Sequence, residues 1–254
     1  MKLKIKNILV SQPKPAELEK SPYYELARKN NICVDFHKFI KIEGVTASEF
    51  RKDKVYIADY SAIIFTSRNA VDHFFRISKE MRVEISDSMK YFCISEATAF
   101  YLQKYVPYRK RKIFHGKQTF VDLMDIILKK YKDENFLLPC SDIQKVSIAK
   151  LLDANKIKYR RAVIYKTFAS NLSKVDIKKY DILIFFSPSG VKSLFKNFPE
   201  YTQNSTLIAA FGPTTSKAVK DAGLKLNINA PTKNAPSMTM AIEQYMKKCN
   251  KKKK

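Results

Sequence analysis

Short apolar runs alternate with amphipathic stretches along the whole chain, and this alternation constrains the fold more than any other feature. Each run is followed by a turn that contains Ser, Pro, Gly or Asn, and then by apolar residues at helical spacing. Alternation of this kind is typical of parallel sheets covered by helices on both faces. The predicted fold class is therefore α/β.

The same patterns predict approximate bounds for the elements. The expected strands are apolar runs at 5–10, 34–39, 62–65, 91–94, 136–139, 162–167, 182–186 and 207–211. The expected helices carry an apolar face and cover 22–30, 69–78, 96–104, 119–130, 144–154, 191–196 and 214–222. Gly223 is expected to follow the end of the last helix, because glycine adopts the left-handed conformation there without strain.

An internal repeat divides this pattern into two similar halves. The segment 62–71, AIIFTSRNAV, resembles the segment 182–191, ILIFFSPSGV. Further along, CISEAT at 93–98 resembles AFGPTT at 210–215. In each of these segments a buried strand ends in small polar residues just before a helix. The chain thus contains four strand-to-helix junctions of one kind.

These junctions are suited to bind anions. Ligands of open parallel sheets bind at the carboxyl ends of the strands, where a helix N-terminus offers unpaired backbone N–H groups and a partial positive charge. Ser, Thr and Asn at such positions are also ordinary helix N-caps, so any single junction is explained by capping alone. Four similar junctions favour a ligand with several acidic groups.

The net charge of +24 is compatible with such a ligand. Six lysines at 247–254 contribute part of it, and this run is expected to be a disordered tail. The remaining excess reflects either a lysine-rich composition or a poly-anionic partner, which would be a nucleic acid or a small polycarboxylate. The basic run RKRK at 109–112, with Tyr105 and Tyr108 before it, is compatible with phosphate contacts and also with a solvated loop.

Other common chemistries have little support. The chain has five glycines and lacks a Walker loop, a G-x-G-x-x-G motif and a G-x-S-x-G motif. Its four cysteines form no C-x-x-C pair and its three histidines have no second ligand nearby in sequence, so no metal site is expected. The apolar runs are too short for a membrane helix or a signal peptide, which predicts a cytoplasmic protein without membrane contact.

At its junctions the sequence resembles the uroporphyrinogen-III synthase family. The resemblance covers nearly the whole chain and rests on FTSRNAV at 65–71, VIYKT at 163–167, FFSPSGV at 185–191, AAFGPTT at 209–215 and APT at 230–232. Two places depart from the family pattern. LPCSD at 138–142 replaces an Arg-Gly pair that is frequent in the family, and Ser95-Glu96 stands where the second junction usually has a glycine.

The resemblance implies two α/β domains with parallel sheets flanked by helices, joined by a two-stranded β-ladder. Domain 1 would be discontinuous and comprise 1–36 and 170–254. The ladder would comprise 37–43 and 163–169, and an inserted domain 2 would comprise 44–162. Both ladder segments are β-prone and bracket a self-contained alternating segment, which agrees with this division.

The resemblance also implies a lyase of porphyrin and haem biosynthesis. Its substrate would be hydroxymethylbilane, a linear tetrapyrrole with eight carboxylates, which the upstream deaminase could hand over directly. The reaction removes water, inverts the last pyrrole ring through a spiro intermediate and closes the macrocycle, without metal or cofactor. Since the open chain also closes spontaneously without inversion, the enzyme must act by positioning. From the sequence itself a monomer is expected, because no long exposed apolar stripe stands out, and no nucleic-acid partner is expected.

The expected site residues lie at the four junctions and on one strand. Those expected to bind the carboxylates are Thr66, Ser67, Arg68, Asn69, Ser95, Thr98, Ser187, Pro188, Ser189, Gly190, Gly212, Pro213, Thr214 and Thr215. Tyr165 matches the family's tyrosine-bearing strand and is the candidate proton donor to the leaving hydroxyl. Its phenol is protonated at neutral pH, because its ordinary pKa is about 10. A buried aromatic with only a packing role is the alternative for this residue.

Two other functions remain open from the sequence. The first is a nucleic-acid-binding α/β protein, which the charge and the basic run favour, although the basic residues are scattered and no recognised nucleic-acid module is present. The second is a protein that binds a small anion without catalysing a reaction.

Overall fold

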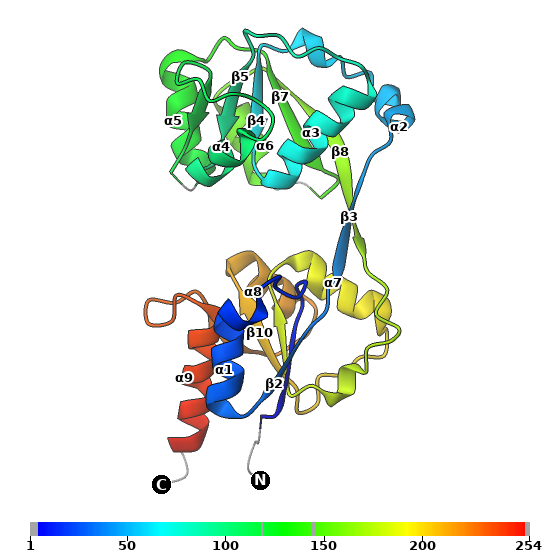
Figure 1. Ribbon diagram of the computed structural model, residues 1–254, viewed down its shortest axis with the longest axis vertical. Coiled ribbons are helices and arrows are strands. Elements are labelled where there is room, and N and C mark those ends of the chain that lie inside the picture. Colours follow the sequence, from blue (N-terminus) through cyan, green and yellow to red (C-terminus); the bar gives the residue numbers. More distant parts are fainter. Residues whose placement is uncertain (1–4, 118, 144–145, 252–254) are drawn as a thin grey trace. The chain divides into compact units, whose positions relative to one another are not determined.

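The computed structural model describes residues 5–117, 119–143 and 146–251 (Figure 1). The chain divides into two compact units, of which unit 1 comprises Met1–Lys41 and Phe168–Lys254 and unit 2 comprises Ile42–Thr167. This division assigns every residue to one unit or the other. The assignment of 37–43 and 163–169 to a separate ladder therefore stays a prediction.

Unit 1 contains, within the described ranges, a five-stranded sheet in the order β11-β10-β9-β1-β2, and its neighbouring strands are all parallel. Helices α1 and α9 lie side by side on one face, and α7 and α8 lie on the other (Figure 1). The elements are β1 (Asn7–Val10), η1 (Leu18–Lys20), α1 (Pro22–Asn30), β2 (Cys33–Phe36), η3 (Ile177–Lys179), β9 (Ile182–Phe185), α7 (Pro188–Asn197), β10 (Leu207–Phe211), α8 (Pro213–Asp221), β11 (Leu226–Ala230) and α9 (Met238–Lys251).

The strands of unit 1 are apolar at successive positions because both faces of the sheet are covered. In β1, Ile8 and Val10 pack with Leu26 of α1, whereas Leu9 points to the opposite face and packs with Leu194 of α7. All three strand residues are at most 1% exposed. This explains why a continuous apolar run, and not an alternating one, marks each strand in the sequence.

Among the described residues, a six-stranded sheet has the order β3-β8-β7-β4-β5-β6 and belongs to unit 2, except for the two residues at one end of β3 and of β8 that the division assigns to unit 1. Helices α2, α3 and α4 pack on one face, and α5 and α6 pack on the other. The elements are β3 (Ile40–Gly44), α2 (Ala47–Lys52), η2 (Ile57–Asp59), β4 (Ala62–Phe65), α3 (Arg68–Glu80), β5 (Lys90–Cys93), α4 (Glu96–Leu102), β6 (Ile113–His115), α5 (Phe120–Lys130), β7 (Phe136–Ser141), α6 (Val146–Ala154) and β8 (Tyr159–Ala169).

The expected α/β fold class is confirmed, and the second sheet is mixed at one edge. Strands β4 to β8 pair in parallel, as expected. Beside β8, the N–H of Val45 donates to the carbonyl of Ile164, and the N–H of Ser170 donates to the carbonyl of Phe39. Residue numbers rise on one strand as they fall on the other, so β3 runs antiparallel to β8.

The structure adds elements that the apolar pattern did not predict and corrects one expectation. Elements α2, β6 and β11 were not expected, and α7 begins earlier than predicted, at Pro188, whose fixed φ suits the first turn of a helix. The expectation of a disordered lysine tail is wrong for Lys247 to Lys251, which belong to α9. Tyr245 and Met246 of this helix pack against the core of unit 1, and the helix therefore continues into the lysine run. Residues 252–254 of the tail, and 144–145 of one expected helix, lie outside the described residues.

Gly223 has φ of +75° and follows Ala222, the C-cap of α8, so it takes the predicted left-handed position just past the helix. None of the described helices is long and apolar enough to cross a membrane.

Candidate active site

The first junction of unit 2 joins β4 to α3. Ser67 is the N-cap of α3, and its Oγ accepts the N–H of Ala70 at 3.1 Å. A side-chain cap satisfies one of the first N–H groups of a helix. In the described part of the chain this leaves the N–H groups of Arg68 and Asn69, both exposed residues, for a ligand. The guanidinium of Arg68 lies 5.3 Å from the ring centre of Tyr101, which holds it beside the helix N-terminus.

The second junction of unit 2 joins β5 to α4 at the same edge of the sheet, because β4 and β5 are parallel neighbours. Ser95 caps α4, and its Oγ accepts the N–H of Thr98 at 3.4 Å and lies 3.2 Å from the Thr98 hydroxyl. The side chain of Thr98 is 5% exposed, so it packs inside unit 2. Glu96, the departure from the family pattern, is exposed at the first position of the helix.

Tyr165 lies on β8 near the first of these junctions. Its hydroxyl is 3.4 Å from the Oγ of Ser67, within hydrogen-bonding distance, and its side chain is buried. Burial raises the pKa of Tyr165 above its ordinary value, and the hydrogen bond with Ser67 offsets part of this. The phenol is therefore protonated throughout the neutral range and can donate a proton or a hydrogen bond.

Two residues of α3 hold the Tyr165 ring in place. The imidazole of His73 stacks on the phenol, with ring centroids 5.1 Å apart. Arg76 Nε donates to His73 Nδ1 at 3.3 Å, so the proton of the neutral imidazole is on Nε2. Burial lowers the pKa of His73 below its ordinary value of 6.5, and the charge of Arg76 lowers it further.

Arg76 also fixes the strand that carries Tyr165. One terminal nitrogen of its guanidinium donates to the carbonyls of Val45 at 2.7 Å and Ile164 at 3.2 Å. Gly44 allows this approach, because a Cβ at that position would lie 2.6 Å from the guanidinium carbon. The residue that follows β3 and the residue that precedes the tyrosine on β8 thus share one partly buried cation as their hydrogen-bond donor.

The first junction of unit 1 repeats the geometry of Ser67. Ser187 caps α7, and its Oγ accepts the N–H of Gly190 at 3.1 Å. Pro188 has no N–H, so the N–H of Ser189 is the first-turn donor left for a ligand in the described part of the chain. Gly190 brings the helix close to Ser11, whose Oγ would lie 3.6 Å from a Cβ at the glycine. Ser11 follows β1, the strand next to β9.

The second junction of unit 1 has no side-chain cap at all. Gly212 is the N-cap of α8, with φ of +88° and ψ of 154°, a conformation that is essentially restricted to glycine. Pro213 follows it at the first helical position. The N–H groups of Thr214 and Thr215 are therefore left for a ligand, whereas the Thr215 side chain is buried, at 1% exposure.

A cavity of about 600 Å³ adjoins this helix N-terminus. Its lining includes Gly212, Ser216 and two lysines of α8, Lys217 and Lys220. The Ser216 hydroxyl donates to the side-chain oxygen of Asn229 at 2.7 Å and so ties α8 to the end of β11. The two lysines give the cavity positive charge, which Asp221 in the same lining offsets in part, and Lys220 lies in the last turn of α8.

The other departure from the family pattern, the segment 138–142, has a structural role. Asp142 Oδ1 accepts the N–H of Thr167 at 3.0 Å, and the Asp142 N–H donates to the carbonyl of Tyr165 at 3.2 Å. This aspartate thus braces the strand segment that follows β7 against the tyrosine-bearing strand.

Within the described ranges, no group of three or more His, Cys, Asp or Glu is placed to hold a metal ion. The cysteines are free, and Cys93 and Cys140 are buried while Cys33 is exposed.

The sequence predicted the junctions, but not the residues that position Tyr165 and not the lysines of α8. His73 contacts Tyr165, and Arg76 contacts His73, but the contact with Tyr165 forms only in the tertiary fold and no local motif marks either residue. Lys217 and Lys220 could have been found, because their spacing places them on one side of the helix that starts at Pro213.

Two α/β units, each with helix N-termini at the carboxyl ends of neighbouring parallel strands, define an α/β protein suited to acidic ligands. Solved structures share this fold. The uroporphyrinogen-III synthetase of Helicobacter pylori 26695 aligns with a TM-score of 0.62 and 18% identity over 96% of this chain and 99% of its own. A mutant uroporphyrinogen III synthase of the extremely thermophilic bacterium Thermus thermophilus aligns with a TM-score of 0.60 and 14% identity over the same shares. No curated protein matches the sequence.

The family model for uroporphyrinogen-III synthase HemD matches residues 24–240. The chain belongs to this family, which makes it a lyase of porphyrin biosynthesis whose family substrate is hydroxymethylbilane. The resemblance found in the sequence is thereby confirmed. Neither alternative function, nucleic-acid binding or non-catalytic anion binding, gains support from the comparisons.

Proposed function

We propose that the chain cyclises hydroxymethylbilane to uroporphyrinogen III with Tyr165 as the proton donor. The observation that carries this role is the position of the phenol, 3.4 Å from the hydroxyl that caps α3. A substrate carboxylate held by the first-turn N–H groups of α3 would bring the rest of the bilane near Tyr165. The phenol would then protonate the leaving hydroxyl as the carbon–oxygen bond breaks.

We assign the carboxylate contacts to the first turns of α3, α4, α7 and α8. Backbone N–H groups supply most of the donors, because the Ser67, Ser95 and Ser187 hydroxyls already accept helix N–H groups. Arg68 in unit 2 and the pair Lys217 and Lys220 in unit 1 add charge. Such contacts suit the chemistry, because a substrate fixed by its acidic groups loses the freedom to close without inverting the last ring.

Water loss leaves a cationic conjugated pyrrole at one end of the bilane. Tyr165, after giving up its proton, would be a phenolate beside that cation and would be stabilised by the Ser67 hydroxyl. The deprotonation that restores aromaticity after ring closure releases a proton, which can return to the phenolate. The tyrosine would thus end the cycle in its starting state.

The function is tested by supplying porphobilinogen and the upstream deaminase and separating the oxidised porphyrin isomers. We expect the type III isomer to exceed the background at which the bilane closes spontaneously to type I. Only type I product from correctly folded protein would overturn the proposed function.

We further propose that the chain works as a cytoplasmic monomer that takes hydroxymethylbilane directly from the deaminase. The spontaneous closure of free bilane supports this, since hand-over shortens the time in which the wrong isomer forms. Sedimentation of the purified protein gives its mass in solution and so tests whether it is a monomer. Dilution of both enzymes at constant ratio tests the hand-over, because transfer within a stable complex keeps the type III fraction constant, whereas transfer through solution lowers it.

A further inference from the structure

Unit 2 has a pocket at the end of its sheet opposite to the candidate active site. Met89 and Lys112, which line it, immediately precede β5 and β6, whereas the Ser95 junction follows β5. Because β5 and β6 are parallel, the pocket lies at the amino ends of both strands, whereas the candidate active site lies at the carboxyl ends. Its volume is about 370 Å³, within the range of roughly 300–1,000 Å³ that is typical of small-molecule sites.

One wall of the pocket is a fixed aromatic pair. The rings of Phe75 and Tyr105 stack with centroids 4.5 Å apart and planes 2° apart. The Tyr105 hydroxyl donates to Asp72 Oδ1 at 2.6 Å, which holds the outer ring in place. Tyr105 is nevertheless 40% exposed, so the pair is preformed and accessible. Such a wall is suited to a planar ring, because aromatic groups gain by stacking beyond their burial alone.

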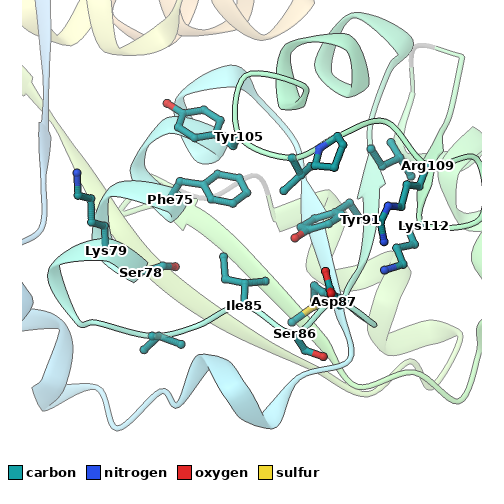
Figure 2. Close-up of a pocket in the computed structure, with 15 residues that line it drawn as sticks. Phe75, Ser78, Lys79, Ile85, Ser86, Asp87, Tyr91, Tyr105, Arg109 and Lys112 are labelled. Carbon is teal, nitrogen blue, oxygen red and sulfur yellow. The ribbon is translucent and has the colours of Figure 1, made fainter.

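The floor of the pocket adds a polar group to an apolar surface. Tyr91 is 5% exposed, and its hydroxyl points into the pocket between Phe75 and Ile85 (Figure 2). No residue of the described ranges forms a hydrogen bond with this hydroxyl. Burial raises the pKa of Tyr91 to about 12, so the group is a hydrogen-bond donor at any physiological pH. A ligand with an acceptor atom would satisfy it.

Two cations lie on the side opposite to the aromatic pair (Figure 2). They are Arg109 and Lys112, the first and last residues of the basic run. The backbone N–H of Lys112 donates to the Arg109 carbonyl at 2.8 Å, and this turn places both side chains on the pocket side. Among the described residues neither cation has a carboxylate within ion-pair distance. Asp87 also lines the pocket, but the cations outnumber it.

We propose that this pocket binds a small molecule that combines a planar aromatic ring with an acidic group. The ring would lie against Phe75 and Tyr105, and the acidic group would contact Arg109 and Lys112. Nucleotides and aromatic carboxylates share this chemistry. The site is independent of the cyclisation chemistry, since no residue that lines it belongs to the junctions or contacts Tyr165.

The test uses 8-anilinonaphthalene-1-sulfonate, a planar aromatic anion whose fluorescence rises on binding, with the full-length protein. The Arg109→Gln/Lys112→Gln variant should bind it at least about tenfold more weakly. The matched control is Lys110→Gln/Arg111→Gln, which removes two exposed charges from the same run that do not line the pocket, and it should keep the wild-type affinity. Equal losses in both variants would show a diffuse basic surface and would overturn the proposal.

Two further variants and a competition experiment complete the test. Ile85→Trp fills the pocket without removing charge and should abolish binding, whereas Tyr165→Phe should leave the affinity unchanged whether or not the tyrosine acts in catalysis. Competition then identifies the source of the ligand. Displacement by adenosine monophosphate indicates a nucleotide, and displacement by indole-3-acetate indicates an aromatic carboxylate. Displacement by neither would contradict the proposal.

Discussion

The imidazole ring of His73 stacks on the phenol ring of Tyr165, with centroids 5.1 Å apart and planes 24° apart. The stack fixes the orientation of the hydroxyl that we assign as the proton donor. Because His73 itself is fixed by Arg76, the orientation is set by three residues in series: a cation, a neutral imidazole and a phenol.

Removing the stacked ring should impair the chemical step more than substrate binding. We expect His73→Ala to lower kcat about tenfold with little change in KM, because the phenol loses its support while the helix N-termini stay intact. His73→Phe keeps a stacking ring and should retain activity within about threefold. Steady-state kinetics of type III formation measure both. Equal kinetics for His73→Ala and wild type would show that the stack does not position Tyr165.

The lowered pKa of His73 predicts how stability depends on pH. The folded protein holds this group neutral below its ordinary pKa of 6.5, whereas the unfolded chain takes up a proton there. Unfolding is therefore favoured as pH falls through 6.5 towards the lowered folded pKa, and the loss is complete below that pKa. Urea unfolding at several pH values should show this loss in wild type and a smaller one in His73→Phe. If the free energy of unfolding fell equally with pH in both proteins, the loss would not come from the lowered pKa of His73.

Gly212 should be needed for substrate binding as well as for stability. Nothing lies within 4 Å of a Cβ added there, so Gly212→Ala acts through backbone strain alone, at about 1–3 kcal/mol. The strain falls on the uncapped N-terminus of α8 and should raise KM. Gly223→Ala is the matched control, since it strains the other end of the same helix with no side-chain clash. It should lower stability in urea without changing KM, and an equal rise in KM would remove the role of the N-terminus.

The lysines of α8 should account for part of the salt dependence of ligand binding. We expect Lys217→Gln/Lys220→Gln to weaken binding of uroporphyrin III roughly threefold to tenfold at low salt. The affinity of this variant should also fall less steeply with added salt than the affinity of wild type. Lys174→Gln/Lys178→Gln removes two exposed charges of unit 1 away from the cavity and should change neither quantity. Titrations at several salt concentrations measure this. Wild-type affinity that does not depend on salt would count against carboxylate contacts.

The sequence predicted the parts of the fold that depend on local patterns. Strands such as β4 and β9 are buried on both faces and therefore appear as continuous apolar runs. Strand β6 was missed because it has three residues, too few for a periodicity. Helix α2 was missed although its N-cap Thr46 and the following Glu49 form the spacing of a capping box.

The parts of the candidate site that depend on local patterns were also predictable. Junction serines are recognisable at strand ends, and Ser67 and Ser187 indeed cap their helices in the same way. The partners of Tyr165 could not be predicted, because they come from a helix far away in sequence. Their contacts exist only once β4 and β8 are in the same sheet.

The most direct test of the proposed chemistry is the rate of type III formation by Tyr165→Phe, measured with the upstream deaminase and compared with Tyr60→Phe, a partly buried tyrosine of the same unit. We expect Tyr165→Phe to form type III roughly 10²-fold more slowly than wild type, with type I accumulating in its place, and Tyr60→Phe to match wild type. A wild-type rate in folded Tyr165→Phe would contradict the assignment of this tyrosine as the proton donor.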